Sequence, residues 1–265
     1  MSWKFQAIQY QWWAAEENTP RFRLGLPDVL DGAVDWQLPN GGALPLHRLF
    51  ALEGHLKAGV LAWSASDLQH HVRGSDLILE YPYSESTPTG VECYWRPTVI
   101  PAGGMSLEWL VSANTRLLDE NIQWSVASEF EAAGVVVGVT DAAGGCAEFT
   151  ALERGRSEWE SSPTTWESPL AGQRIVLLDL PNAAGSVAIA TAAGDQRQLC
   201  LELVPTKAGV FNVSIKYDLQ MGFLEKGVIR RARLWCLWLP SNLDSRERML
   251  DLLREFLSSP QPLTV

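Results

Sequence analysis

Short segments rich in glycine and proline divide this chain, and each lies between two strand-like apolar runs. There are six of them: residues 38–42, 101–104, 141–145, 181–185, 192–195 and 205–209. Glycine supplies the positive φ of tight turns, and proline or aspartate favours turn initiation. Loops of four or five residues with a glycine are typical of β-hairpins. We therefore expect a succession of hairpins, with little room for helices.

Apolar and polar residues alternate in the runs between these turns. The clearest case is residues 211–218, where the apolar positions are Phe211, Val213, Ile215 and Tyr217. Residues 198–203, 107–114 and 122–131 alternate in the same way. Successive side chains of a strand point to opposite faces, so this pattern predicts antiparallel sheets with one buried and one wet face.

Three further runs predict strands of a different kind. Residues 135–140 and 175–180 are continuously apolar, which is typical of strands covered on both faces. Residues 228–239 form a long strand with Ala232, Leu234, Cys236 and Trp238 on one side. Arg231, Arg233, Trp235 and Leu237 lie on the other side.

One segment, residues 242–257, has a convincing helical pattern. Ser241 followed by Asp244 forms a capping pair, and an apolar stripe runs through Leu243, Leu250, Leu253 and Leu257. Pro260 and Pro262 prevent its continuation. Residues 65–73 are a weaker candidate, either a turn of helix or a loop.

The elements together predict an all-β fold, a large antiparallel β-sandwich of two packed sheets with one C-terminal α-helix. The chain shows no shift in composition and no repeat, so residues 1–265 are expected to form a single domain that carries the helix at 242–257.

The balance of charge excludes several classes of partner. The 265 residues contain 21 Lys and Arg against 31 Asp and Glu, a net charge of −10. Sequence-independent nucleic-acid binding and adhesion to anionic membranes both need a basic surface. The chain also lacks an apolar stretch long enough to span a bilayer and an N-terminal signal peptide, so we expect a cytoplasmic protein.

The spacing of the cysteines and the absence of known nucleotide-binding motifs predict a protein without a metal or an organic cofactor. Cys93, Cys146, Cys200 and Cys236 lie at least 36 residues apart, and no CxxC pair occurs. We expect four unpaired, reduced thiols and no metal or organic cofactor. The chain has no GxGxxG, GxxxxGK[ST] or GxSxG sequence, which excludes the dinucleotide, P-loop and serine-hydrolase classes that depend on them.

Polar faces of three consecutive strands form the candidate site. Residues 92–98, 106–114 and 122–131 are joined by short turns and are expected to pair in sequence order. Their wet faces would bring together Glu92, Tyr94, Arg96, Glu108, Gln123 and Glu129. The alternative is an ordinary solvated face with cross-strand Glu–Arg pairs.

Roles for these side chains follow from their chemistry. Glu129 and Glu108 are the candidate catalytic groups, because paired carboxylates can act as acid and base at a glycosidic or hemiacetal carbon. Tyr94, Arg96 and Gln123 are the candidate substrate-binding groups, and the planar fork of Arg96 suits a pair of hydroxyls or a carboxylate.

Histidine and tryptophan supply the remaining candidates. Among four histidines, His71 is the candidate acid or base, since imidazole titrates near neutral pH; the alternative is a surface imidazole. His70 and His71 are adjacent and would point to opposite faces of a strand, so they could not bind one metal. Trp159 and Trp166 lie in a polar stretch, where an aromatic ring either binds the apolar face of a sugar or anchors the loop.

Two segments carry a resemblance to a known superfamily. They are VECYWRPTVIPAGGMSLEWLVSAN at residues 91–114 and KGVIRRARLWCLWLP at residues 226–240. In chain length and in their long antiparallel strands they resemble the galactose-mutarotase-like supersandwich. The resemblance implies two large sheets and a His and a Glu that open a pyranose ring. No residue here matches a motif position of that family, so no site residue is carried over.

Two classes of function are open at this point. The first hypothesis is a carbohydrate-recognising β-sandwich, with aldose epimerase or mutarotase-like chemistry as its enzymatic form and a sugar as its partner. The alternative is a non-enzymatic interaction scaffold whose C-terminal helix docks on a partner or on its own sheet. A third is a domain without a small ligand, descended from a larger enzyme.

Overall fold

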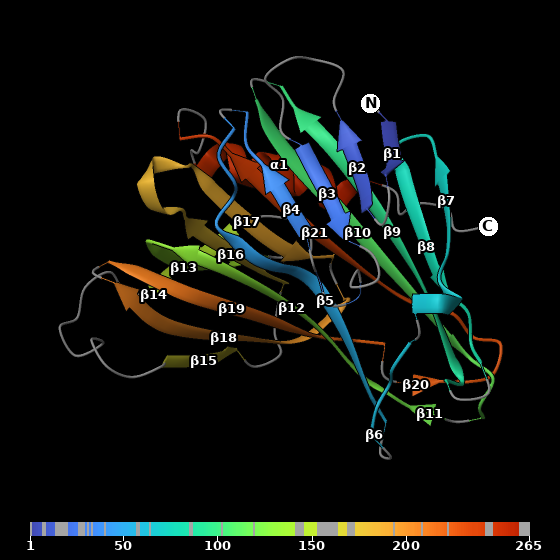
Figure 1. The fold of residues 1–265 in the computed structure, drawn as a ribbon. Coiled ribbons are helices and arrows are strands. Elements are labelled where there is room, and N and C mark those ends of the chain that lie inside the picture. The colour runs from blue at the N-terminus through green and yellow to red at the C-terminus, as the bar shows by residue number, and fades with distance from the viewer. Residues whose placement is uncertain are drawn as a thin grey trace.

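The chain folds into layered antiparallel sheets with one helix against them (Figure 1). The computed structural model describes all residues except 1, 7, 8, 14–20, 26–29, 31, 33, 40, 57, 58, 64, 85, 86, 102, 119, 141–145, 153–163, 169–172, 193, 208, 222, 242–245 and 260–265. Within the described part, strands account for well over half of the residues and the predicted all-β class is confirmed. No helix of that part is long and apolar enough to cross a membrane.

The largest sheet has nine strands. In spatial order they are β14 (Cys146–Leu152), β13 (Gly134–Thr140), β16 (Gln173–Asp179), β17 (Ser186–Thr191), β21 (Arg230–Leu239), β10 (Gly104–Thr115), β9 (Thr89–Ile100), β8 (Asp76–Tyr81) and β7 (Gln69–Arg73). Every neighbouring pair is antiparallel.

Three smaller sheets accompany it. The six-stranded sheet consists of β15 (Thr164–Ser168), β18 (Gln196–Lys207), β19 (Val210–Leu219), β12 (Gln123–Ala132), β5 (Leu46–Leu56) and β6 (Gly59–Val60). The four-stranded sheet consists of β1 (Ser2–Gln6), β2 (Gln9–Trp13), β3 (Arg21–Gly25) and β4 (Val34–Gln37). The two-stranded sheet pairs β11 (Glu120–Asn121) with β20 (Phe223–Leu224).

The main core lies between the nine-stranded sheet and the other sheets. Every second residue of β9 and β10 enters it, for example Cys93, Trp95, Leu107 and Trp109, and the apolar side of β19 faces them from the six-stranded sheet. The predicted alternation is therefore confirmed. We call the opposite side of the nine-stranded sheet, which faces away from the main core, its outer face.

The strands that were predicted to be covered on both faces are buried on both faces in the structure. In β16, Val176 and Leu178 belong to the main core, whereas Ile175 and Leu177 belong to a second core on the outer face. In β21, Ala232 and Leu234 face the main core, while Trp235 and Leu237 face the second core.

The second core lies under the helix α1 (Arg246–Ser258). Its buried stripe is Met249, Leu252, Leu253 and Phe256, one residue in every three or four. Of the predicted stripe, Leu253 is fully buried and Leu250 and Leu257 are partly buried. The helix ends one residue later than predicted, and residues 242–245, with Asp244 of the capping pair and Leu243, lie outside the described part. Its apolar face thus docks on the chain's own sheet.

Two of the six turn segments do not close hairpins. Residues 38–42 lead from β4 to β5, and residues 192–195 lead from β17 to β18, and both connections pass between different sheets. Three segments join neighbouring strands as predicted: 101–104, 181–185 and 205–209. Strands β13 and β14 also pair, although residues 141–145 between them are not described.

The structure tests two local predictions, of which one changes. Residues 65–73 are neither a helical turn alone nor a loop, because a short 3-10 helix at Ala65–Asp67 is followed by the edge strand β7. The thiols of Cys93, Cys200 and Cys236 are unpaired as predicted, whereas the side chain of Cys146 lies outside the description.

Tryptophans concentrate in the main core. Phe50 stacks on Trp109 with ring centroids 5.5 Å apart and also contacts Trp95. Phe50 has a φ of 55°, which is strained for an aromatic residue, at an irregularity in the pairing of β5 with β12. The hydroxyl of Ser128 on β12 accepts the Phe50 N–H at 3.1 Å, so the bulge leaves no unpaired donor and directs the ring inward.

Candidate functional site

The predicted three-stranded site does not form, because β12 belongs to the other large sheet. Strand β10 pairs with β9 as expected, but its second neighbour is β21. Strand β12 pairs with β5 and β19. The turn after β10 therefore crosses between sheets, which places Glu108 and Glu129 on different sheets.

The candidates on the six-stranded sheet are separate from the rest. Glu129 forms an ion pair with Arg48 at 3.6 Å. Gln123 is exposed and lines a shallow groove of about 680 Å³ with His55 and Lys216 among others. Trp166 lies in the edge strand β15, but its side chain is not described, and Trp159 falls outside the described residues.

Four other candidates share the outer face of the nine-stranded sheet. Residues directly opposite each other on antiparallel strands lie on the same face. His71, Ile78, Tyr94, Leu110 and Arg233 form one such row across five strands. The row on one side of it contains Arg96 and Glu108, which lie opposite each other. The structure thus brings together His71, Tyr94, Arg96 and Glu108.

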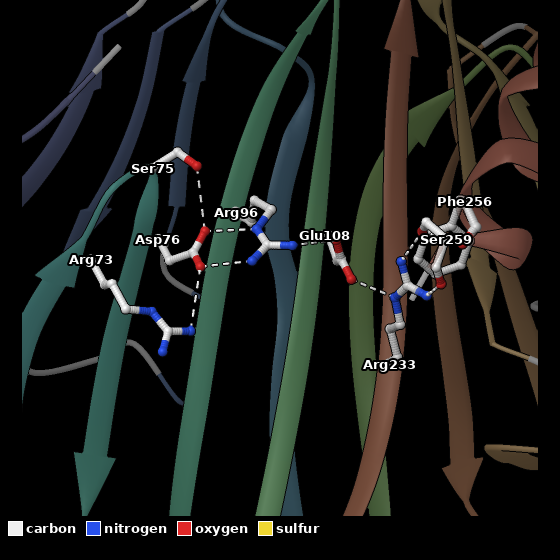
Figure 2. A network of polar contacts seen from close by, with 8 residues as sticks. All are labelled: Arg73, Ser75, Asp76, Arg96, Glu108, Arg233, Phe256 and Ser259. Carbon is white, nitrogen blue, oxygen red and sulfur yellow. Dashed lines mark hydrogen bonds and ion pairs between the residues drawn. The ribbon is translucent and has the colours of Figure 1, made fainter. Parts of the chain in front are cut away.

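A chain of alternating charges crosses this face (Figure 2). We call it the charge ladder: Arg73, Asp76, Arg96, Glu108 and Arg233, from strands β7, β8, β9, β10 and β21. Arg96 binds the Asp76 carboxylate through both prongs of its fork, with Nε–Oδ1 and Nη2–Oδ2 distances of 2.7 Å. These hydrogen bonds raise the pKa of Arg96 further.

The ladder ends on the helix. Arg233, only 3% of whose side chain is exposed, donates to Glu108 through Nε and to the Ser259 carbonyl through Nη1 at 3.0 Å. Its Nη2 donates to the Ser259 hydroxyl, and its guanidinium lies 4.2 Å from the centre of the Phe256 ring. A cation at this position satisfies a carbonyl at the end of α1 and complements the helix dipole. The ladder therefore fastens the helix to the sheet.

Both carboxylates of the ladder are occupied. Asp76 is held by Arg96, and Glu108 lies between Arg96 and Arg233. Neither carboxylate is free to accept a substrate proton without losing a guanidinium partner. The fork of Arg96, predicted to bind a sugar, binds Asp76 instead.

A pocket opens on the same face, on the other side of the His71–Tyr94 row. This outer pocket has a volume of about 410 Å³, within the usual range of small-molecule sites. Its lining comprises Glu80, Tyr81, Pro82, Tyr83, Gly90, Val91, Glu92, Ser112, Asn114, Arg116, Ile229 and Arg231. Gly90 keeps it open, because a Cβ there would lie 3.0 Å from Asn114 Oδ1 and 3.3 Å from the Tyr83 ring.

Three polar atoms of this lining lack a hydrogen-bond partner among the described residues. They are Ser112 Oγ, Asn114 Oδ1 and Arg231 Nε, all shielded from solvent. Ser112 is only 6% exposed. Buried polar atoms are nearly always paired in folded proteins, so three such atoms around one pocket indicate a place for a polar ligand or ordered water.

Two carboxylates form one end of the pocket. Glu80 and Glu92 lie directly opposite each other on β8 and β9, and neither forms an ion pair within the described part of the chain. Glu92 accepts a hydrogen bond from the Tyr94 hydroxyl. Burial, together with this bond, raises the pKa of Tyr94 to about 12, so Tyr94 remains a donor that orients the carboxylate.

Sequence reasoning identified Glu92 as part of the polar face but missed the other pocket residues. The alternation in residues 228–239 correctly placed Arg231 on the same side of its strand as Arg233 and Trp235. The cross-strand neighbour of Arg231, Ser112, could not be identified from the sequence, because the two residues are more than a hundred positions apart. Glu80 lies in a short strand of mostly buried residues, which gives no strong alternation.

The described residues contain no group of three or more His, Cys, Asp or Glu side chains that could hold a metal ion. The side chains that line the outer pocket offer hydrogen bonding, charge and proton transfer. Carboxylates, guanidinium groups, an amide and a hydroxyl are the groups that recognise polyols.

Comparison with known proteins identifies the fold alone. No protein-family model matches the sequence, and no curated protein does. A protein assigned as an aldose 1-epimerase from Klebsiella pneumoniae matches with a TM-score of 0.50 and 8% identity, over 94% of this chain and 86% of that chain. HI1317 matches with a TM-score of 0.44 and 12% identity, over 86% and 91%.

The GH36 alpha-galactosidase AgaB from Geobacillus stearothermophilus also matches, with a TM-score of 0.44 and 9% identity over 90% of this chain. This chain spans only 41% of that galactosidase. The match to the epimerase, which covers nearly all of both chains, agrees with the layered antiparallel sheets described above. The chain has the galactose-mutarotase-like supersandwich fold.

Proposed function

We propose that this protein binds a carbohydrate in the outer pocket of the nine-stranded sheet. The observation that carries the proposal is the meeting, in one pocket, of the Glu80–Glu92 pair with three unpartnered buried polar atoms. A sugar supplies several hydroxyl groups at close spacing, and each can act as both donor and acceptor. Such a ligand would satisfy Ser112, Asn114 and Arg231 together.

The pocket also offers an apolar surface. The ring of Tyr83 lies under the guanidinium of Arg116 at 3.8 Å, and Ile229 is 53% exposed at the rim. A pyranose has apolar C–H faces as well as hydroxyl edges, and the exposed side chain of Ile229 offers such a face an apolar contact. The fold agrees with this proposal, since the epimerase assigned from Klebsiella pneumoniae shares it.

Mutarotase-like chemistry is the finer form of the proposal. Opening a pyranose ring requires a base at the anomeric hydroxyl and an acid at the ring oxygen. We assign the base to Glu92, which Tyr94 orients, and the acid to His71, which lies on the same face at the edge strand β7, one row away from the pocket lining. Glu108 and Glu129 have no part in it, because the ladder occupies one and the other lies on the opposite sheet.

Titration calorimetry with free hexoses at millimolar concentrations tests binding. We expect saturable binding by the parent protein and its loss in Glu92→Gln. Glu129→Gln is the matched control, since it makes the same chemical change on the other sheet and should leave binding intact. Equal loss in both variants, or no binding of any hexose, would refute the proposal.

Polarimetry tests the finer form. The protein should accelerate the interconversion of α- and β-glucose, and both Glu92→Gln and His71→Gln should abolish the acceleration. Binding without acceleration would leave a carbohydrate-binding protein and exclude the enzymatic form. Of the two forms of the scaffold alternative, the structure shows the one in which the apolar face of α1 packs on the chain's own sheet.

A further inference from the structure

The outer pocket is electrically polarised from one end to the other. Glu80 and Glu92 lie on β8 and β9, and Arg231 lies on β21. Strand β10, with the uncharged Ser112, separates the two ends, and Glu92, Ser112 and Arg231 are in register. Neighbouring strands are about 4.8 Å apart, so the backbone positions of Glu92 and Arg231 lie about 10 Å apart.

Neither end of the pocket has an ion-pair partner within the described residues. No described ion pair joins either carboxylate to a cation, which contrasts with the fully paired charge ladder two rows away on the same face. Like charges directly opposite each other on adjacent strands are unfavourable, so the Glu80–Glu92 pair is destabilising unless a cation occupies it.

The positive end is equally incomplete. Arg231 Nε is shielded from solvent and has no described acceptor. Arg116 also lines the pocket, but its guanidinium lies over the ring of Tyr83, which follows β8, so Arg231 carries the positive end. A guanidinium with unused donors is the preferred partner of a carboxylate.

From this arrangement we infer that the ligand is a zwitterionic sugar derivative, with a protonated amine at the Glu80–Glu92 end and a carboxylate at the Arg231 end. The inference rests on the proposed function and narrows its substrate class to amino sugars that also bear an acid group. Such a ligand supplies to each end the opposite charge that the fold does not supply. A neutral hexose fills the same space and can form hydrogen bonds at both ends, but it brings no opposite charge to either end.

Four probes that share a hexose ring separate the contributions: glucose, glucosamine, glucuronate and muramic acid, which carries both charges. Titration calorimetry at low ionic strength should give muramic acid the highest affinity, about tenfold or more above glucose, since charge-assisted hydrogen bonds are about twice as strong as neutral ones. Glucosamine and glucuronate should fall between them. The preference should shrink at high salt, because these charges are partly exposed.

Two variants assign the ends. Glu80→Gln should lower the affinity for glucosamine and muramic acid severalfold more than the affinity for glucose and glucuronate. Arg231→Gln should lower the affinity for glucuronate and muramic acid severalfold more than the affinity for glucose and glucosamine. Glu129→Gln and Arg254→Gln make the same changes elsewhere and should alter none of the four affinities, and thermal melting confirms that each variant is folded.

The possible failures are distinguishable. If all four probes bind with equal affinity, or if only one charged end matters, the zwitterion inference is wrong and carbohydrate binding stands. If no probe binds, the proposed function itself is wrong.

Discussion

The outer face of the nine-stranded sheet has a closed half and an open half, and β21 runs through both. Toward its C-terminal end, Trp235 and Leu237 point to this face and are buried under α1. Toward its N-terminal end, Arg231 points to the same face and lines the outer pocket. Three residues of β21, with Arg233 in the middle, separate the packed core from the outer pocket.

The charged side chains of the two halves differ both in burial and in pairing. Arg233 and Glu108 lie at the boundary and are paired with each other and with the end of the helix. Glu80 and Glu92 lie beyond the boundary and have no cationic partner among the described residues. A buried charge such as that of Arg233 needs a partner within the protein, whereas a half-buried carboxylate can be solvated by water until a ligand binds.

Removing Glu108 should have the largest effect. Glu108→Ala leaves Arg233 buried without its carboxylate, so we expect a loss of about 3–5 kcal/mol in the free energy of unfolding. Glu129→Ala, the same change at an exposed pair on the other sheet, should lose less than about 1 kcal/mol. Urea denaturation measures both. Equal losses would show that the ladder contributes no more than a surface ion pair.

Truncating the helix contact should come next. Leu253 is fully buried in the second core, and Leu253→Ala should reduce the free energy of unfolding by about 3 kcal/mol through lost burial and a residual cavity. Leu250→Ala, at a partly buried position of the same helix, should lose clearly less. Calorimetric titration of the Leu253 variant should still show sugar binding, since the pocket lies in the open half. Loss of binding at a temperature where the variant is folded would contradict this separation.

Sequence patterns predicted the two-faced strands because the information is local. Alternation in β19 and β10 and the continuous apolar run of β16 each report how one strand is covered. The helix was equally legible from its 3.6-residue period. The galactose-mutarotase-like architecture was expected only from a resemblance, carried by residues 91–114 and 226–240 and by the chain length.

The site was not predictable in the same way, because its assembly is non-local. A turn sequence shows that the chain reverses, but both a hairpin and a crossing between sheets require a reversal. The turn after β10 and the turn at 192–195 both cross between sheets. Because the turn after β10 was taken for a hairpin, Glu129 and Gln123 were predicted to lie beside Arg96, whereas they lie on the six-stranded sheet. Arg231 reaches Ser112 only through the pairing of β10 with β21.

The stability of the protein should depend on pH through Asp195, which contacts the backbone of Arg233 at the boundary. Asp195 accepts the backbone N–H of Arg233 at 2.8 Å, and burial raises its pKa from 3.8 to about 6 despite that bond. Because the folded pKa lies above the unfolded one, the stabilisation is complete below about pH 4 and is lost as the pH rises through about 6.

Asp195→Asn retains an acceptor oxygen and removes the titration. The parent protein should lose on the order of 1 kcal/mol of stability relative to this variant over that interval, since the group is partly screened by solvent. Urea denaturation at several pH values measures the difference. A difference that does not change with pH would mean that Asp195 keeps its ordinary pKa in the folded protein.

The smallest effect on stability should come from Ser112, in the open half. Its hydroxyl is shielded and has no described partner, so Ser112→Ala removes a group that gains nothing in the unliganded protein. The free energy of unfolding should stay within about 0.5 kcal/mol of the parent value or rise slightly, whereas sugar affinity should fall severalfold. Ser186→Ala provides a comparison in the closed half. Ser186 is buried to the same extent as Ser112 and makes hydrogen-bonding or electrostatic contact within the protein. There the change should lower stability and leave sugar affinity unchanged. Urea denaturation and calorimetric titration of both variants decide the matter: a Ser112 variant that loses stability but keeps its affinity would place this hydroxyl with the architecture of the closed half.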